Sequence, residues 1–269
     1  MSAVTADSYS QPALLEFEER LAEAGRGIFL FDYDGTLAPF AVDPGQACPY
    51  AGVIATLDAL ADTGRARIVV VTGRYLLEAM PVLAMRTTPE MWGSHGRERL
   101  LPDGRYEIAR LDDYTVQALT LADAWAEDVE AAGGRVERKP GSIAFHWRGT
   151  GTRQVVRIRQ AVTQGFNREA LEDVLEICNF DGGIELRAPG IDKGHVVRTI
   201  LAETVAAEPV VYLGDDATDE DAFQALRNHG LGVLVRDAHR STAAHFRVGP
   251  PEGLLALLER WRTLLAGVP

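Results

Sequence analysis

The stretch Ile28-Phe29-Leu30-Phe31-Asp32-Tyr33-Asp34-Gly35-Thr36-Leu37 decides the fold of this chain. Its leading apolar residues predict a buried strand, and the strand ends on two carboxylates that are separated by one residue. Because open α/β folds bind ligands at the carboxyl ends of their strands, the acid pair predicts a functional site there. Two carboxylates so close repel each other unless a cation bridges them, so the simplest interpretation is a magnesium site.

The acid pair also suits phosphoryl transfer. Asp32, at the end of the strand, can supply a nucleophilic oxygen and a metal ligand. Asp34, on the turn beyond it, can give its proton to a leaving oxygen and take one back from water.

Composition excludes several classes of protein. A chain of 269 residues, 46% of them hydrophobic, can bury one large core or a core and a smaller domain. The net charge of -12 argues against nucleic acid or an anionic membrane as a partner, because either favours a basic surface. The first dozen residues contain no basic and apolar leader, and no later run reaches the ~18 apolar residues of a membrane span. We therefore expect a soluble monomer that is neither exported nor embedded in a membrane.

The cysteines Cys48 and Cys178 are too few and too far apart for a zinc knuckle or a disulfide framework. They predict a reducing compartment, hence the cytoplasm. We expect both thiols to be buried.

Apolar runs alternate with helical periodicity along the chain, which is typical of βαβ units and a parallel sheet. Strands are predicted at 28–31, 67–71, 210–213 and 231–235, and helices at 14–24, 52–61, 193–202, 220–227 and 252–265. A hairpin is predicted at 99–108, turning at Asp103-Gly104. The predicted fold is α/β, with a Rossmann-like parallel-sheet core.

A segment inside this pattern has elements of its own. Helices are predicted at 114–132 and 152–165, and strands at 135–139, 142–147 and 183–187. The segment is long enough to form a small independent layer. We interpret 112–189 as an inserted α/β cap domain, and 1–111 together with 190–269 as the core.

Two further signals lie at a strand end and at a helix start. Thr72-Gly73-Arg74 follows the second strand, so a hydroxyl and backbone N–H groups point to the crevice of Asp32, where they suit a phosphate oxygen. Taken alone, Thr72 is more often a helix cap. Lys193 opens a helix, where the dipole disfavours a cation, so it is either a solvated lysine or the partner of an anion held beside the metal.

The last signal is a cluster of acids after the strand 210–213. The strand leads into five acids within the segment 215–221. N-terminal capping explains Asp219 and Glu220, because a helix start favours carboxylates. Capping explains Asp215 less well, since that residue lies at the end of the strand.

The order and spacing of these motifs resemble the fourfold signature of the haloacid dehalogenase superfamily. The insertion between the threonine and lysine motifs resembles the α/β cap domain, called type 2, that some members of this superfamily carry. More narrowly, the segments 32–37, 72–74, 93–98, 185–187 with 193–194, and 214–220 resemble the trehalose-6-phosphate phosphatase family. The resemblance covers nearly the whole chain from about Ile28 onward.

This resemblance implies a reaction and a cofactor. Asp32 would attack phosphorus and become an aspartyl phosphate, while Asp34 would serve first as acid and then as base. Mg²⁺ would be held by Asp32, by the backbone carbonyl of Asp34, by Asp215 and, through water, by Asp219. Thr72 and Lys193 would bind the transferring phosphoryl oxygens.

The resemblance also implies a sugar site. Alternation places Glu137 and Lys139 on one face of a strand. Without the resemblance, we would interpret this face as charged and exposed to solvent. The residues implied in binding the sugar phosphate, a small molecule of trehalose biosynthesis, are Gly73, Arg74, His95, Glu98, Glu137, Lys139, Arg148 and Glu185. For His95 and Glu98, the alternative is that their side chains form hydrogen bonds that stabilise the fold. No glycosyltransferase segment precedes the motifs, so we expect another protein to make the substrate.

Three alternatives remain open. The first is a phosphatase for another sugar phosphate, such as sucrose phosphate, glucosylglycerol phosphate or a pseudo-disaccharide phosphate. The second is a phosphoreceiver switch, which would need neither Asp34 nor the insertion. The third is a catalytically silent protein that binds a sugar phosphate on the same scaffold, although every catalytic position carries a competent side chain.

Overall fold

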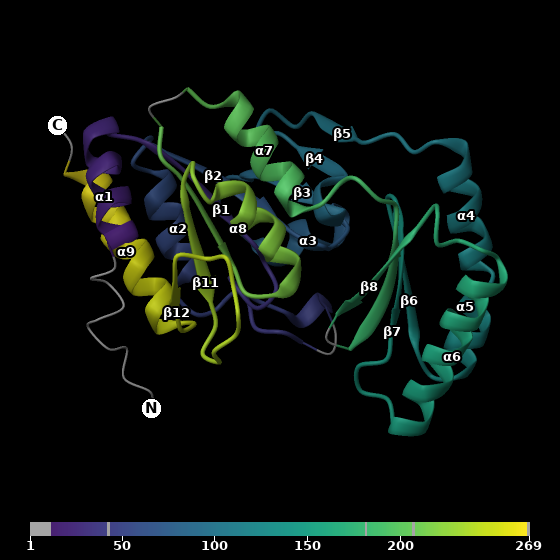
Figure 1. Ribbon diagram of the computed structural model, residues 1–269. Helices are drawn as coiled ribbons and strands as arrows, with labels where there is room; N and C mark the ends of the chain where they lie inside the picture. The colour runs from purple at the N-terminus through teal and green to yellow at the C-terminus, as the bar shows by residue number, and fades with distance from the viewer. Residues whose placement is uncertain (1–11, 42–43, 181, 206–207, 268–269) are drawn as a thin grey trace. The chain divides into compact units, whose positions relative to one another are not determined.

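The computed structural model of the protein describes residues 12–41, 44–180, 182–205 and 208–267. The chain divides into two compact units (Figure 1). The larger unit holds the residues up to Tyr106 and those from Asp192 onward, and the smaller unit holds Glu107–Ile191. The sequence predicts the inserted domain at 112–189, and the role of this domain as a cap stays a prediction. The segment 1–11, where we expect no leader, lies outside the described residues.

The larger unit is built on an eight-stranded sheet with the order β12-β11-β10-β1-β2-β3-β4-β5. β1 (Gly27–Phe31) lies between β10 (Val210–Gly214) and β2 (Ala66–Val71), and all its residues are buried. The strands from β12 to β3 pair in parallel, whereas β4 is antiparallel to β3. The other strands are β3 (Glu90–Gly93), β4 (Glu98–Leu100), β5 (Tyr106–Ile108), β11 (Leu231–Val235) and β12 (Phe246–Val248).

Helices cover both faces of this sheet. One hydrophobic cluster packs the sheet against α1 (Pro12–Ala24), α2 (Val53–Ala61), α3 (Leu76–Leu83) and α9 (Glu252–Ala266). The other packs it against α7 (Lys193–Glu203) and α8 (Glu220–Leu226). A strand buried on both faces has to be apolar throughout, which explains the uninterrupted apolar run of β1. The α/β core with a parallel sheet is therefore confirmed.

The strand order brings three motifs to one edge of the sheet. Phe31 at the end of β1 pairs with Leu213 of β10 and with Val70 of β2. The N–H group of Asp32 continues this ladder by donating to the Leu213 carbonyl at 2.9 Å. The segments that follow β1, β2 and β10 therefore leave the sheet at the same edge, as the sequence predicts.

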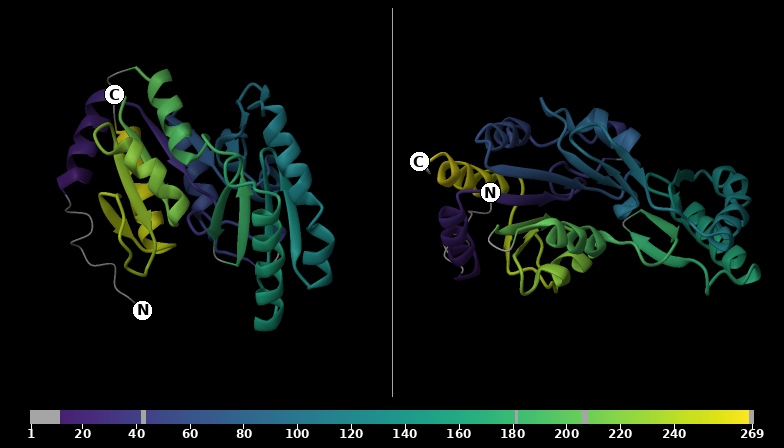
Figure 2. Two further views of the ribbon diagram at one scale, coloured as in Figure 1. Left: turned by 45° about the vertical axis from the view of Figure 1, so that its right-hand side comes forward. Right: turned by 90° about the horizontal axis from the view of Figure 1, so that it is seen from above.

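The smaller unit is a four-stranded antiparallel sheet with helices on one face. Its order is β6 (Arg135–Lys139), β7 (Ser142–His146), β9 (Gly183–Arg187) and β8 (Glu176–Phe180). In Figure 1 and in the right-hand view of Figure 2, the helices α4 (Asp113–Asp123), α5 (Ala126–Ala131) and α6 (Thr152–Arg168) lie on the same side of the sheet. Alternate strand residues such as Phe145 and Leu186 pack under these helices. The other face of the sheet carries Arg135, Glu137 and Lys139 of β6, whereas Arg138 lies on the helix face and donates to Asp123 of α4.

Several sequence predictions need correction. The helix predicted at 114–132 is two helices, α4 and α5, because the chain turns at Trp125, whose indole is buried against Phe145. Helix α3 and strands β3, β8 and β12 were not predicted from the sequence. Cys48 is exposed and Cys178, on the edge strand β8, is only partly buried, so the expectation of two buried thiols is wrong. Within the described ranges, every helix falls short of the length or the hydropathy that a membrane span requires.

Candidate active site

Asp32 and Lys193 form the centre of the candidate site. The buried ammonium of Lys193, at the start of α7, donates to Asp32 Oδ1 at 2.7 Å. The hydroxyl of Thr36 lies 3.4 Å from the other carboxylate oxygen. Lys193 is only 3% exposed, so the interpretation as a solvated lysine is wrong. Burial opposes its charge, but the carboxylates of Asp219 and Asp32 raise the pKa of Lys193 above its ordinary value, so it stays an ammonium.

Asp219 is a fully hydrogen-bonded acid at the base of the site. Its Oδ1 accepts from Lys193 Nζ and from the hydroxyl of Tyr212, each at 2.7 Å. Its Oδ2 accepts from the N–H groups of Asp215 and Asp216, each at 2.9 Å. A carboxylate offers about four lone-pair sites, and these contacts fill them. Asp219 therefore belongs to a local capping arrangement and also anchors Lys193.

Asp215 has the opposite environment. It follows β10, is 3% exposed, and its buried Oδ1 has no hydrogen-bond partner among the described residues. Burial raises the pKa of Asp215, and the charges of Asp32 and Asp219 raise it further. Gly35 packs against this carboxylate with φ +84°, and a Cβ there would lie within 2.6 Å of its atoms. Only glycine therefore allows the turn after the first acid pair to approach Asp215 so closely.

These acids fit a hard divalent cation. Asp32, Asp215 and Asp219 each place an oxygen within 4.8 Å of the others, and Lys193 is the cation that bridges two of them. The unpartnered oxygen of Asp215 and the excess of negative charge suit Mg²⁺, which prefers carboxylate oxygens. The carboxylates of Asp32 and Asp215 are candidate ligands, and the predicted role of the Asp34 backbone carbonyl stays a prediction. The water-mediated role of Asp219 stays a prediction, and its own oxygens are already occupied.

Thr72 lies at the end of β2 and is completely buried. Its hydroxyl oxygen accepts from the N–H group of Arg74 at 3.1 Å, and a hydroxyl that accepts one bond can still donate its hydrogen to another group. The cap residue of α3 is Tyr75, which makes no side-chain capping bond, so Thr72 is not the helix cap that its position alone suggests.

Arg74 contacts the second acid of the first pair. Its guanidinium forms two hydrogen bonds with Asp34, at 2.6 and 2.5 Å. The backbone at Gly73 passes so close to the ring of His95 that a Cβ would lie 2.5 Å from it. Gly73 and Arg74 are thus tied to the candidate site, and their predicted contact with substrate stays a prediction.

His95 and Glu98 belong to a strained turn beside Thr72. Ser94 and His95 have φ of 48° and 57°, in the left-handed region that disfavours such residues. The His95 N–H group donates to the Thr72 carbonyl at 3.0 Å. Glu98 is fully buried and accepts from Tyr106 at 2.6 Å and from the Ser94 hydroxyl. Structural hydrogen bonding therefore accounts for Glu98, while the predicted substrate contacts of both residues are not tested by these bonds.

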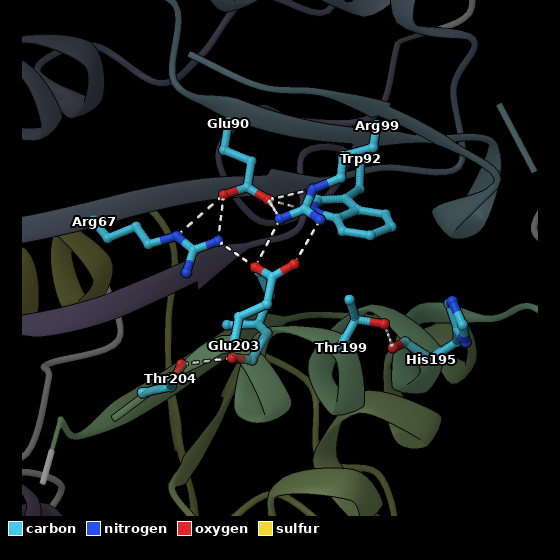
Figure 3. A network of polar contacts seen from close by, with 9 residues as sticks. Arg67, Glu90, Trp92, Arg99, His195, Thr199, Glu203 and Thr204 are labelled. Carbon is cyan, nitrogen blue, oxygen red and sulfur yellow. Dashed lines mark hydrogen bonds and ion pairs between the residues drawn. The ribbon is translucent and has the colours of Figure 1, made fainter. Parts of the chain in front are cut away.

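A network of four charges supports the far end of α7 (Figure 3). Glu90 of β3 is 2% exposed and accepts from Arg67, Arg99 and the indole of Trp92. Both arginines also donate to Glu203 in the last turn of α7. Two strands therefore hold the helix whose first residue is Lys193. This network was not predicted from the sequence, although alternation places Glu90 and Trp92 on one strand face.

The predicted sugar residues of the smaller unit form a second cluster. Strand register places Glu137 of β6 and Glu185 of β9 in one row, on either side of Ala144. Lys139 Nζ lies 2.6 Å from Glu185 Oε1, and the Ser142 hydroxyl donates to the same oxygen at 2.7 Å. Arg148 follows β7 and packs beside Gly182. The structure thus joins Lys139 and Glu185 directly, whereas their role in binding sugar stays a prediction.

Glu137 has a partner that the sequence analysis did not find. His146 of β7 lies on the same face, and its Nε2 is 2.7 Å from Glu137 Oε2. Burial opposes ionisation of Glu137, but the hydrogen bond with His146 and the charge of Lys139 lower its pKa to about 2. Alternation along β7 would have predicted Ser142 and His146 on this face.

Comparison with known proteins identifies the family of the chain. The family model described as trehalose-phosphatase matches residues 30–250. The chain belongs to this family. A curated relative, the trehalose-phosphate phosphatase of Mycobacterium marinum, is 35% identical over 239 residues, which are 84% of this chain and 59% of the relative. The chain thus spans about three fifths of the length of the curated relatives it matches.

Solved structures agree with the trehalose-phosphatase fold. The C-terminal domain of Candida albicans trehalose-6-phosphate phosphatase superposes with a TM-score of 0.77 at 22% identity, covering 94% of this chain and 98% of that domain. A trehalose-6-phosphate phosphatase related protein superposes with a TM-score of 0.70 at 26% identity, covering 88% of this chain and 98% of that one. The predicted family and fold class are confirmed.

Proposed function

We propose that this member of the trehalose-phosphatase family is a magnesium-dependent phosphatase that hydrolyses trehalose 6-phosphate to trehalose and inorganic phosphate. The observation that carries the proposal is the buried carboxylate of Asp32, which accepts a hydrogen bond from Lys193 and lies within 4.8 Å of carboxylate oxygens of Asp215 and Asp219. A carboxylate so placed is fixed for attack while its surroundings can neutralise a phosphoryl group.

The reaction proceeds in two halves. In the first, Asp32 attacks phosphorus and the bond to the sugar oxygen breaks, while Asp34 gives that oxygen a proton. In the second, Asp34 takes a proton from water, the water oxygen bonds to phosphorus, and the Asp32 carboxylate is released. Lys193 and the hydroxyl of Thr72 bind the transferring oxygens, because a loose phosphoryl transition state needs positioning and positive charge more than covalent help.

Mg²⁺ would bind to Asp32, Asp215 and the Asp34 carbonyl, where it would supply positive charge to the phosphoryl oxygens. Glu137, Lys139, Arg148 and Glu185 would bind the sugar hydroxyls, and the buried pair of Lys139 and Glu185 supports this role because both side chains are already oriented. Family membership and the names of the relatives support trehalose 6-phosphate as the substrate. The cytoplasmic location and the monomeric state stay predictions.

A panel of phosphate esters tests the proposal. The purified protein with Mg²⁺ is offered trehalose 6-phosphate, sucrose phosphate, glucosylglycerol phosphate and glucose 6-phosphate, and released inorganic phosphate is measured. We expect the highest kcat/KM for trehalose 6-phosphate, and we expect Asp32→Asn to abolish turnover of every ester. A higher kcat/KM for another sugar phosphate would identify that ester as the substrate in place of trehalose 6-phosphate. Turnover by Asp32→Asn would contradict a mechanism through an aspartyl phosphate.

A further inference from the structure

Arg74 connects two of the strand ends that carry the proposed reaction. Its Nε donates to Asp34 Oδ2 at 2.6 Å and its Nη2 to Asp34 Oδ1 at 2.5 Å. A planar guanidinium that binds both oxygens fixes the rotation of a carboxylate as well as its position. Asp34 needs such a restraint, because its side chain is 26% exposed and lies on the turn beyond β1.

The guanidinium of Arg74 is itself held in place. It lies over the ring of Tyr33, with 5.1 Å between Cζ and the ring centroid. Tyr33 is completely buried, and its hydroxyl lies 2.7 Å from the Ala47 carbonyl and 3.1 Å from the Val82 carbonyl. The surface on which Arg74 rests is therefore rigid.

The backbone of Arg74 is restrained from two sides. Its N–H group donates to the Thr72 hydroxyl at 3.1 Å, and its carbonyl accepts from the N–H group of Ser94 at 2.8 Å. The side chain is only 9% exposed. Every part of the residue is thus fixed relative to β2, and its charged end is directed at Asp34.

We infer that Arg74 is the positioning residue for Asp34. It holds the carboxylate of the general acid and base in one orientation instead of binding the transferring phosphoryl group. The inference rests on the proposed function, since it assigns Arg74 to the proton transfers of that reaction. Misplacement of a reacting group by 1 Å costs about 100-fold in rate, so a restraint of this kind matters for turnover.

The test separates the two halves of the reaction with p-nitrophenyl phosphate. In the first half, Asp32 bonds to phosphorus and nitrophenolate leaves with its electron pair, which needs little help from an acid. In the second half, water attacks and loses its proton to Asp34. The rate of the rapid first release of nitrophenolate therefore measures the attack by Asp32, whereas the rate of steady turnover measures the proton transfer to Asp34.

We expect Arg74→Gln to keep the rate of the first release within about twofold and to lower steady turnover by about 10- to 100-fold. Arg74→Lys should not restore turnover, because an ammonium keeps the charge but cannot bind both oxygens in one plane. The matched control is Arg86→Gln, which removes an exposed arginine that also pairs with acids and should leave both rates unchanged. A first release slowed as much as turnover, a rise in KM with unchanged turnover, or rescue by Arg74→Lys would each overturn the inference.

A second comparison tests whether the loss of turnover in Arg74→Gln acts through Asp34. In an Asp34→Asn background, Arg74→Gln should lower the residual turnover by less than about twofold, because a residue that acts through Asp34 has nothing left to position. An additional loss as large as in the wild type would mean that Arg74 acts on the substrate directly. If the wild type hydrolyses p-nitrophenyl phosphate but not trehalose 6-phosphate, the proposed substrate fails while the role of Arg74 is still decided by these rates.

Discussion

Asp215 and Asp219 belong to the same acidic segment of the sequence but have contrasting hydrogen-bond environments. Asp219 accepts four hydrogen bonds, whereas the buried Oδ1 of Asp215 accepts none from the described residues. A fully bonded carboxylate stabilises the fold, because its donors would otherwise be buried without partners. A buried carboxylate without partners destabilises the fold unless a cation binds it. We therefore expect a structural role for Asp219 and a metal-binding role for Asp215.

This contrast predicts stability changes of opposite sign. Without Mg²⁺, Asp215→Asn should raise the free energy of unfolding by about 1 kcal/mol, because it removes a buried charge that Asp32 and Asp219 repel. Asp219→Asn should lower it by about 3 kcal/mol, because it breaks a buried pair with Lys193. Urea unfolding of both variants measures the two changes. Equal destabilisation by the two substitutions would contradict the assignment of Asp215 as the metal-binding acid.

The sequence predicted which side chains gather at the site but not how they pair. Asp32, Thr72 and Asp215 follow strands, and parallel pairing alone brings strand ends to one edge. The bonds from Arg74 to Asp34 depend instead on side-chain rotamers and on the ring of Tyr33, which no periodicity encodes. The acceptor pattern of Asp219 likewise became visible only once Tyr212 and two backbone N–H groups were placed around it.

Strands could be predicted from the sequence where both of their faces are buried. The central strands β1, β10 and β11 are apolar throughout, and β2 is apolar and buried from Ile68 onward, so their positions follow from the sequence. Helix α3 was missed because Pro81 lies inside it and prolines usually interrupt helices. Strand β8 was missed because an edge strand with the sequence EICNF has few residues that favour strands.

The charged face of the smaller sheet predicts that the free energy of unfolding depends on pH. The folded pKa of Glu137 is about 2, below its ordinary value of 4.5. Its ionised form therefore stabilises the fold at pH values above about 4.5, and this contribution is lost as the pH falls toward about 2. The difference in urea midpoint between the wild type and Glu137→Gln should accordingly shrink between pH 5 and about pH 2.

The control for this prediction is Glu172→Gln, which removes an exposed carboxylate from the same unit. It should shift the urea midpoint little at any pH. A difference between the wild type and Glu137→Gln that stays constant down to about pH 2 would mean that His146 and Lys139 do not hold Glu137 in its ionised form.

The division of the chain into two units separates two kinds of chemistry. The larger unit contains the acids, Lys193 and Arg74, whereas the smaller unit contains the buried Lys139–Glu185 pair. Each unit has its own hydrophobic core. Units with separate cores unfold as one only if they are strongly coupled, so a ligand of one unit stabilises that unit first.

Magnesium should therefore stabilise the larger unit selectively. A cation present at 100 times its Kd adds about 2.7 kcal/mol to the unit that binds it, which corresponds to a rise in Tm of about 5 to 10 °C. Hydrogen exchange with and without Mg²⁺ should show slower exchange in peptides from β1 and β10 and unchanged exchange in peptides from β6 and β7. Asp215→Asn should abolish the effect and Glu137→Gln should retain it, since only Asp215 belongs to the acid cluster. Equal slowing in both units, or slowing that survives Asp215→Asn, would place the cation outside this cluster.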